Sequence, residues 1–280
     1  MHILNRRSFC TMRRALLSMT AMLCFMAMLA PAVAQQDPRY YELDVPYVPT
    51  PPEVVSAMLE MAQAGPEDFV IDLGSGDGRI AIAAVRERNA RGAFGVDIDR
   101  ERVDEANENA RQAGVTDRVT FKVQDLFKTD LSPASVITMY LLPNVNMSLR
   151  PKLLEMPAGT RIVSHAFSMG DWRADAFQSL GRRDVYLWIV PAKVQGEWRI
   201  QGPEGPMTLQ LEQTFQTFTG TARHADHVYA VRDGMLKGKE IRFSIDKDGV
   251  VQSWVGLVEG GSMVSIDSPG TVIGWSGGRQ

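Results

Sequence analysis

Three glycines stand at alternate positions, Gly74, Gly76 and Gly78, directly after the short apolar run "FVIDL" at 69–73. Glycine has no Cβ, so a ligand or a neighbouring helix can approach the main chain closely, and positive φ angles cost little. The helical pattern that begins near Gly78 directs free backbone N–H groups back toward the loop. Open α/β sheets bind ligands at the carboxyl ends of their strands, so we predict a ligand cradle here.

The charge beside this loop limits the kind of ligand. Asp72 stands two residues before the first glycine, where a carboxylate repels a phosphate and attracts an ammonium group. A dinucleotide fingerprint needs the spacing G-x-G-x-x-G, but position 79 is an arginine and the spacing is G-x-G-x-G. S-adenosylmethionine carries an ammonium and a sulfonium group and no phosphate. It therefore suits this loop better than the dinucleotide of a nicotinamide oxidoreductase does.

Two further aspartates follow the next two predicted strands. Asp97 lies at the tip of "GAFGVDI", 25 residues after Asp72, where a carboxylate can accept both ribose hydroxyls. Asp125 follows "RVTFKV" and can accept from an adenine amino group, while Leu126 packs on the adenine face. Each aspartate taken alone is better explained by the capping of a turn or helix. Three of them at successive strand ends beside the glycine loop favour cofactor binding.

The elements that position these residues alternate between strand and helix. Five short apolar runs, beginning with "FVIDL" and ending with "GTRIVSHAF" at 159–167, are separated by segments of helical periodicity. This alternation is typical of an α/β fold with a parallel sheet covered by helices on both faces. A preceding helix is predicted from the capping box of Thr50 and Glu53, with Pro51 at the first helical position and Gly65 at the end.

After about Gly181 the helical periodicity disappears. Short alternating runs are separated by the turn sequences "DG", "DKDG", "EGG" and "DSPG". We predict a small C-terminal antiparallel β unit, a meander or a partial barrel. The expected domains are therefore an α/β domain at 47–201 and a β-rich domain at 202–280.

The first 34 residues resemble an export signal. Four arginines precede a 16-residue apolar run, and Ala32 and Ala34 form a small-x-small cleavage site. The run is short for a membrane span, although an uncleaved inner-membrane anchor remains the alternative. Arg6 and Arg7 suit either a twin-arginine signal or an ordinary basic leader. We expect an exported, periplasmic protein that contacts the membrane only through this segment, followed by a polar linker at 35–46.

Charge and composition exclude some classes of partner. The leader holds four of the 30 basic residues and none of the 33 acidic ones, so residues 35–280 carry a formal charge of −7. This charge argues against binding to nucleic acid. Both cysteines lie in the leader, and His224, Asp226 and His227 lack further ligands nearby, so a solvated loop is favoured there and no metal site is predicted.

Four blocks of sequence resemble a known family. The chain over about 47–200 is similar to class I S-adenosylmethionine-dependent methyltransferases. The blocks "PYVPTPPEVV", "DLGSGDGRIAIAA", "YLLPNVNMSLRPKLL" and "GTRIVSHAFSMGDW" resemble the lysine methyltransferases that include the ATP-synthase c-subunit enzyme and its bacterial relatives. The resemblance implies a Rossmann-like sheet of seven strands, with "DVYLWIV" and "GEWRI" as its last two strands. The β unit and the leader are not part of that family's core.

The resemblance also implies roles for individual residues. The methionine end of the cofactor is expected on Asp72, Gly74, Ser75 and Gly76, the ribose on Asp97, and the adenine on Asp125 and Leu126. Tyr47 and Thr50 are expected to close the cofactor pocket, and Leu141, Leu142, Pro143 and His165 to line the acceptor channel. Tyr140 and Asn144 are the predicted catalytic residues, with the Asn144 carbonyl holding the acceptor amine.

The chemistry expected at this site is in-line transfer of a methyl group to an amine. Such a transfer depends mainly on positioning, and an apolar, tyrosine-walled channel favours the neutral amine. The acceptor is expected to be a protein lysine or a smaller amine, and the sequence assigns no general base and no oligomeric state. The alternative is an exported, non-catalytic binding or scaffold protein that retains a methyltransferase fold.

Overall fold

The computed structural model describes residues 47–280. The predicted signal peptide at 1–34 and the linker at 35–46 lie outside the described residues. The described residues belong to one compact unit. Within the described part of the chain, no helix combines the length and the apolar character that a membrane span needs.

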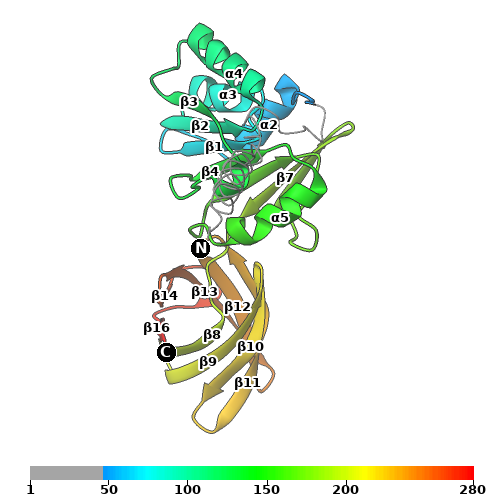
Figure 1. Cartoon of the computed structure of the whole chain (residues 1–280). Coiled ribbons are helices and arrows are strands. Elements are labelled where there is room, and N and C mark those ends of the chain that lie inside the picture. Colours follow the sequence, from blue (N-terminus) through cyan, green and yellow to red (C-terminus); the bar gives the residue numbers. More distant parts are fainter. Residues whose placement is uncertain (1–46) are drawn as a thin grey trace, which may run out of the picture. The chain divides into compact units, whose positions relative to one another are not determined.

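The first part of this unit alternates helices and strands, as the sequence predicts (Figure 1). Its helices are α2 (Pro52–Met61), α3 (Arg79–Arg88), α4 (Arg100–Ala113) and α5 (Pro143–Leu154), with the short 3₁₀ helix η1 (Leu126–Lys128). Its strands are β1 (Phe69–Leu73), β2 (Gly92–Asp97), β3 (Val119–Val123), β4 (Val136–Met139), β5 (Arg161–His165), β6 (Ala176–Leu180) and β7 (Arg183–Ile189).

These strands form a seven-stranded sheet in the order β3-β2-β1-β4-β5-β7-β6. The pairs among β1 to β5 are parallel, whereas β7 is antiparallel to both β5 and β6. Because successive side chains of a strand point to opposite faces, Val70 packs beneath α2, α3 and α4, while Ile71 packs beneath α5. The predicted α/β fold with helices on both faces is thus confirmed.

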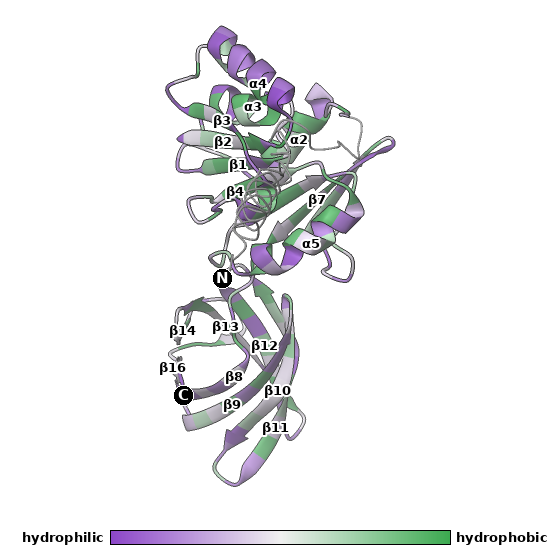
Figure 2. Cartoon of the chain, viewed as in Figure 1, coloured by the Kyte–Doolittle hydropathy of each residue, from purple (hydrophilic) through white to green (hydrophobic). Residues whose placement is uncertain are grey.

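Hydropathy along these elements follows their burial. In Figure 2 the outer surface of α4 is hydrophilic, whereas green hydrophobic residues lie along the strands of the sheet. The buried residues of α4 are Val103, Ala106 and Ala110, which recur at helical spacing and face β2 and β3. The order places β1 between β2 and β4, which is the point where the strand order reverses. Ligands of open α/β sheets bind at that point.

The start of α2 differs from the predicted capping box. The N-cap residue is Pro51, whose carbonyl accepts from the N–H groups of Val54 and Val55, and no side chain in the described part of the chain caps the helix. The Thr50 hydroxyl instead lies 3.2 Å from His165 Nδ1, and Glu53 pairs with Arg183. The prediction was wrong because partners from distant parts of the chain engage both side chains.

The seventh strand of the sheet also differs from the prediction. "DVYLWIV" lies in β7 as expected, but the edge strand is β6, "AFQSL", and not "GEWRI". β6 carries mostly exposed side chains and therefore lacks the apolar alternation of a buried strand. "GEWRI" lies in β8 of the second sheet, so the change of sheet falls at 190–195 and not at Gly202.

The second sheet forms a closed antiparallel barrel. Its strands are β8 (Gly196–Gly202), β9 (Gly205–Thr214), β10 (Thr217–His224), β11 (His227–Lys237), β12 (Glu240–Lys247), β13 (Val250–Glu259), β14 (Ser262–Ser265), β15 (Thr271–Val272) and β16 (Ser276–Arg279). β12 pairs with β13, while β16 pairs with both β14 and β8, and these pairings close the ring. The two-residue β15 pairs with β13 alone.

The barrel interior is filled by side chains. Trp198, Trp254 and Trp275 are at most 3% exposed, and Phe243 packs against the last two with ring centroids 5.8 and 6.2 Å away. A barrel of about eight strands is just wide enough for side chains to fill it. The barrel therefore has a packed aromatic core, and its contacts with other groups are made from its outer surface and its turns.

Candidate active site

The glycine loop lies beneath two side chains of the chain itself. Gly74 and Gly76 have φ angles of 74° and 52°, which only glycine adopts without strain. A Cβ at Gly76 would lie 2.4 Å from the Tyr47 ring, and one at Gly74 would lie 2.8 Å from Leu141 Cδ2. The loop therefore needs glycine for its conformation and for the close approach of Tyr47 and Leu141.

Asp72 is a buried carboxyl group with one partner. Its Oδ1 accepts a 2.7 Å hydrogen bond from the Thr138 hydroxyl, and its Oδ2 has no partner among the described residues. Burial raises the pKa of Asp72 to about 7, and the nearby Asp97 and Asp77 add to this effect. Within residues 47–280 no cationic side chain pairs with Asp72, so an ionised carboxylate in this position is suited to receive an ammonium group.

Asp97 ends β2 and organises the glycine loop. Its Oδ2 accepts from the Gly76 N–H at 2.9 Å, and its Oδ1 accepts from the Asp99 N–H at 3.0 Å. Because a carboxylate oxygen has two lone pairs, each oxygen can still accept one further hydroxyl. Capping and ligand binding are therefore compatible at Asp97.

The third predicted cofactor contact also caps a turn. Asp125 accepts from the Phe127 N–H at 2.9 Å, which starts η1, and it lies 3.6 Å from the Lys128 ammonium. Leu126 is half-buried beside it. The Ser75 hydroxyl is buried and has no partner among the described residues. The roles of Asp125, Leu126 and Ser75 toward the cofactor stay predictions.

The segment before α2 is tied to the glycine loop by Arg79. The Arg79 guanidinium pairs with Asp77 and donates to the Thr50 carbonyl at 2.9 Å. The Tyr47 hydroxyl accepts from the Asp77 N–H at 3.4 Å. From the sequence alone, Arg79 indicated only that the loop departs from the G-x-G-x-x-G spacing of a dinucleotide site. Its role in fixing the N-terminal segment depends on a contact across 29 residues, which no local pattern signals.

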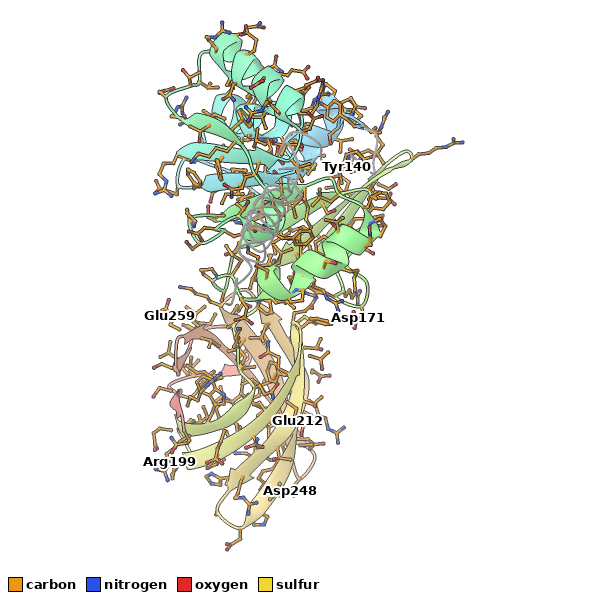
Figure 3. All side chains as sticks on the ribbon, in the orientation of Figure 1. Tyr140, Asp171, Arg199, Glu212, Asp248 and Glu259 are labelled. Carbon is orange, nitrogen blue, oxygen red and sulfur yellow. The ribbon has the colours of Figure 1, made fainter. Side chains whose placement is uncertain are left out.

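Aromatic rings gather at the ends of β4 and β5. The Tyr140 ring centroid lies 4.0 Å from that of His165 and 6.2 Å from that of Phe167. His165 Nδ1 faces the Thr50 hydroxyl. Burial lowers the pKa of His165, and the Arg183 charge lowers it further, so the imidazole is neutral at pH 7. Tyr140 is labelled in Figure 3.

The sequence suggests a role for Asn144 of α5, but the buried asparagine of this helix is Asn146. Asn144 is exposed in the first turn of the helix, and its backbone carbonyl accepts from the Ser148 hydroxyl at 2.9 Å. Asn146 is fully buried, and its Nδ2 lies 3.4 Å from Ser164 Oγ and 3.3 Å from the Phe167 carbonyl. Its Oδ1 has no partner among the described residues. Sequence reasoning missed Asn146.

The predicted channel residues fall on the turn from β4 into α5. Leu141 packs on Gly74, the Leu142 carbonyl accepts the first N–H groups of α5, and Pro143 is the first helical residue. Beyond β5, Phe167 lies near the start of the segment 166–175, which we call the acceptor loop. Arg150 of α5 donates to the Met169 carbonyl of this loop at 3.0 Å.

The residues present fit S-adenosylmethionine. Asp72 offers an unpartnered buried oxygen to an ammonium group, and Asp97 has lone pairs left for hydroxyls. The glycines leave the backbone bare, while the arginine of the loop is engaged by Asp77 and so does not favour a phosphate. Within residues 47–280, no group of three or more histidine, cysteine, aspartate or glutamate side chains is placed to hold a metal ion.

This sheet order, with a glycine loop after β1 and acidic residues at the ends of β1 and β2, defines a class I S-adenosylmethionine-dependent methyltransferase. The model of the family described as the ANTKMT methyltransferase domain matches residues 72–176. A protein-lysine N-methyltransferase from Saccharolobus islandicus (strain REY15A) is 49% identical over 155 residues, which are 54% of this chain and 96% of the relative. The chain belongs to this family of S-adenosylmethionine-dependent methyltransferases.

Two further comparisons agree on the class of enzyme. A crystal structure described as an RNA methyltransferase from Salinibacter ruber in complex with S-adenosyl-L-homocysteine shares 48% identity, with a TM-score of 0.51. It covers 52% of this chain and 96% of its own. The ATP-synthase c-subunit lysine N-methyltransferase of Mus musculus is 29% identical over 56% of this chain and 62% of its own length. The names of these relatives differ in the acceptor.

Proposed function

We propose that this enzyme transfers a methyl group from S-adenosylmethionine to the side-chain amine of a lysine in an acceptor protein. The observation that carries the proposal is the uncharged aromatic wall of Tyr140, His165 and Phe167 beside the glycine loop. The printed name of the Saccharolobus relative, protein-lysine N-methyltransferase, supports the same acceptor.

The cofactor-binding residues divide between the strand ends. S-adenosylmethionine, when bound, supplies an electrophilic methyl group on a sulfonium. Asp72 is positioned to hold the ammonium group and Asp97 the ribose hydroxyls, while Asp125 and Leu126 are assigned to the adenine. Tyr47 and Leu141 lie against the loop at Gly76 and Gly74. The burial of Asp72 strengthens its attraction for the ammonium group.

The acceptor side selects an uncharged nucleophile. Lysine attacks only as the neutral amine, and an apolar, aromatic surrounding lowers the pKa of an ammonium group. The neutral His165 adds no charge to this wall. We assign the orientation of the amine to the Tyr140 hydroxyl and the surrounding rings. Asn144 is too exposed for that role, and the buried carbonyl oxygen of Asn146 replaces it as the amide candidate.

The proposal is tested by methyl transfer from labelled S-adenosylmethionine to poly-L-lysine, to total protein and to total RNA. We expect label in methyllysine after protein hydrolysis. Tyr140→Phe should lower the rate by about 10²-fold, whereas Tyr229→Phe on the barrel should leave it unchanged. Label found only in RNA, or only in a small amine, would contradict a protein acceptor. Titration of S-adenosylhomocysteine into Gln35–Gln280 comes first, because a folded protein without affinity would favour the scaffold alternative.

We also propose that the protein is exported. Residues 1–34 support this, since they combine arginines, an apolar run and a small-residue cleavage site. Cell fractionation with N-terminal sequencing tests it. A periplasmic protein that begins at Gln35 is expected, whereas a membrane-bound protein that retains Met1 would establish the anchor instead.

A further inference from the structure

The turn between β9 and β10 departs from ordinary hairpin chemistry. Thr214 pairs with Thr217, so Phe215 and Gln216 are the two central residues, and Phe215 has a φ angle of 53°. Two-residue hairpins place glycine, asparagine or aspartate at left-handed positions, and a bulky aromatic residue there is an outlier. Such outliers persist where the surrounding contacts over-determine them. The contacts of the Phe215 ring should therefore explain its position.

Phe215 packs outside its own barrel. Its ring stacks on Trp172 with a centroid distance of 6.1 Å and an interplanar angle of 17°, and the Arg150 guanidinium lies 5.3 Å from its centroid. It belongs to the hydrophobic cluster beneath α5, not to the barrel core. The neighbouring Gln216 is 8% exposed, and its Nε2 donates to the Arg173 carbonyl at 2.6 Å. Both residues of the turn therefore contact the catalytic part of the chain.

The turn is itself held firmly. Gln213 Nε2 donates to the Phe215 carbonyl at 2.8 Å and to the Ala192 carbonyl at 2.9 Å, while its Oε1 accepts from the Val194 N–H at 2.7 Å. The Gln216 carbonyl accepts from the Leu236 N–H of β11 at 2.7 Å. One glutamine side chain thus fixes the turn to the segment that joins the two sheets.

The residues that the turn contacts lie in the acceptor loop. Trp172 is fully buried, and its carbonyl accepts from Trp188 Nε1 at 2.8 Å. At the other end of the same loop, Phe167 lies beside Tyr140, and its carbonyl accepts from Ser164 Oγ at 2.8 Å. Asp171, labelled in Figure 3, lies in the same loop and pairs with Arg150. The catalytic sheet contacts both ends of the loop, through Ser164 at the first and Trp188 at the second, and the barrel adds the contacts of Phe215 and Gln216 at the second end.

We propose that Phe215 and Gln216 are positioning residues for the methyl transfer. The β9–β10 turn of the barrel holds the acceptor loop, and through it the Phe167 wall of the acceptor side. The barrel thereby supports the acceptor site. In the described part of the chain, the glycine loop after β1 has no contact with this turn, so cofactor binding should not depend on it. The expected effect of these two residues on acceptor binding rests on the proposed function. Their expected effect on the order of the acceptor loop does not.

The test compares Phe215→Gly with a matched control in the full chain. Ala225 occupies the same left-handed position in the next hairpin, with a φ angle of 51° between the paired His224 and His227. Both glycine substitutions relieve the backbone, but only the first removes a contact with the acceptor loop. Hydrogen exchange should become about tenfold faster at amides 168–175 in Phe215→Gly and stay unchanged in Ala225→Gly.

Three further measurements separate positioning from general stability. The affinity for S-adenosylhomocysteine should stay within about twofold of the parent in both variants. Gln216→Ala should also speed hydrogen exchange at amides 168–175. Phe215→Tyr, which keeps the aromatic ring, should show the exchange rates of the parent. With poly-L-lysine as the acceptor, Phe215→Gly should raise the KM for poly-L-lysine about tenfold and leave the KM for S-adenosylmethionine unchanged.

Two results would overturn the proposal. One is unchanged exchange at 168–175 in Phe215→Gly. The other is an equal loss of protection in the acceptor loop and in the cofactor loop, since that pattern describes a general destabilisation. A parent enzyme that does not methylate poly-L-lysine counts against the proposed acceptor, and the exchange comparison then still decides whether the turn positions the loop.

Discussion

Asp72 and Asp97 end neighbouring strands, yet their surroundings give the two carboxyl groups different properties. Asp72 is buried with a single donor, the Thr138 hydroxyl, and its pKa rises to about 7. Asp97 is half-exposed and accepts from two backbone N–H groups. A backbone-bonded carboxylate is stable without a ligand, whereas a buried one with an unpartnered oxygen gains most from a cation. Asp72 is therefore the residue whose charge the cofactor should affect most.

We predict that Asp72→Asn weakens the binding of S-adenosylmethionine by about 10- to 150-fold, because a charge-assisted hydrogen bond contributes roughly 1.5–3 kcal/mol. Isothermal calorimetry at pH 8 measures the loss. Asp99→Asn is the matched control, since Asp99 caps α4 close by through its own side chain. Equal affinity for the parent and Asp72→Asn would remove Asp72 from the cofactor site.

The same residue predicts a pH dependence of stability. An acid whose folded pKa is raised stabilises the fold most below its unfolded pKa of 3.8, and that contribution is lost as the pH rises through about 7. The free energy of unfolding of the ligand-free parent should therefore fall, relative to Asp72→Asn, by on the order of 4 kcal/mol between pH 4 and pH 8. Urea unfolding of both proteins at several pH values measures the difference. Parallel profiles would contradict the buried, unpaired state of Asp72.

His165 gives a second titration with the opposite sign. Burial and then the Arg183 charge lower the pKa of His165 in the folded state. The stability that the neutral ring contributes is therefore present above pH 6.5 and is lost as the pH falls from 6.5 through that lowered pKa. Arg183→Ala should raise the pKa of His165 without bringing it to 6.5, because burial remains. Arg182→Ala is the control in the same hairpin turn. The chain has four histidines, so the histidine ring signals in an NMR titration can be assigned by substitution. An unmoved His165 signal in Arg183→Ala would show that burial alone sets the shift.

At the scale of elements, the sequence predicted the parallel part of the sheet well. The runs that became β1 to β5 are short, apolar and separated by helical periodicity, and local pattern suffices for such strands. Prediction from local pattern failed where a side chain has a partner that is distant in the sequence. Thr50 contacts His165 and does not cap α2 as predicted. The side chains of β6 are mostly exposed, so its sequence has no periodic pattern that distinguishes an edge strand from a loop.

The candidate site shows the same limit. The glycines and Asp97 were predicted because strand ends and turn chemistry are local features. Asn146 and Phe167 were not, because their importance comes from contacts across 18 to 27 residues of sequence, between α5, β4 and the acceptor loop. Residues that act through tertiary contacts need the fold before they can be recognised.

The glycine loop itself is an element whose conformation can be tested. Gly76 and Gly114 both have positive φ angles, so an alanine at either position costs about 1 kcal/mol of backbone strain. A Cβ at Gly76 also meets the Tyr47 ring at 2.4 Å, whereas one at Gly114 meets nothing within 4 Å. Gly76→Ala should therefore lower the free energy of unfolding by more than Gly114→Ala does, and it alone should weaken the binding of S-adenosylhomocysteine. Equal losses of stability with intact binding would show that Tyr47 does not cover the loop.

At the scale of the whole molecule, the catalytic sheet and the barrel each contribute a partly buried side chain that packs against the core of the other. Phe215 of the barrel packs in the cluster beneath α5, and Ala158 of the catalytic part packs against the barrel core. The Ala192 N–H donates to the Gly238 carbonyl, and Gly238 packs against Gly159. The Saccharolobus relative matches over 96% of its own length with only 54% of this chain. A methyltransferase domain of this family can thus exist at about half this length, while here the domain also packs against the barrel.

We therefore predict that a chain shortened to residues 47–191 binds S-adenosylhomocysteine but unfolds more easily than 47–280. The shortening removes Phe215 from Trp172, a fully buried indole, and exposing part of a large apolar side chain costs about 1.5–3 kcal/mol. Trp172 should then emit at longer wavelength, and Trp172→Phe in the short chain should abolish that shift, because Trp188 is then the one remaining tryptophan. The thermal midpoint and the emission maximum of the two lengths are compared at equal ligand saturation. If both lengths unfold at the same temperature with the same emission from Trp172, the barrel does not support the catalytic sheet, and its contacts through the β9–β10 turn have no energetic consequence for the enzyme.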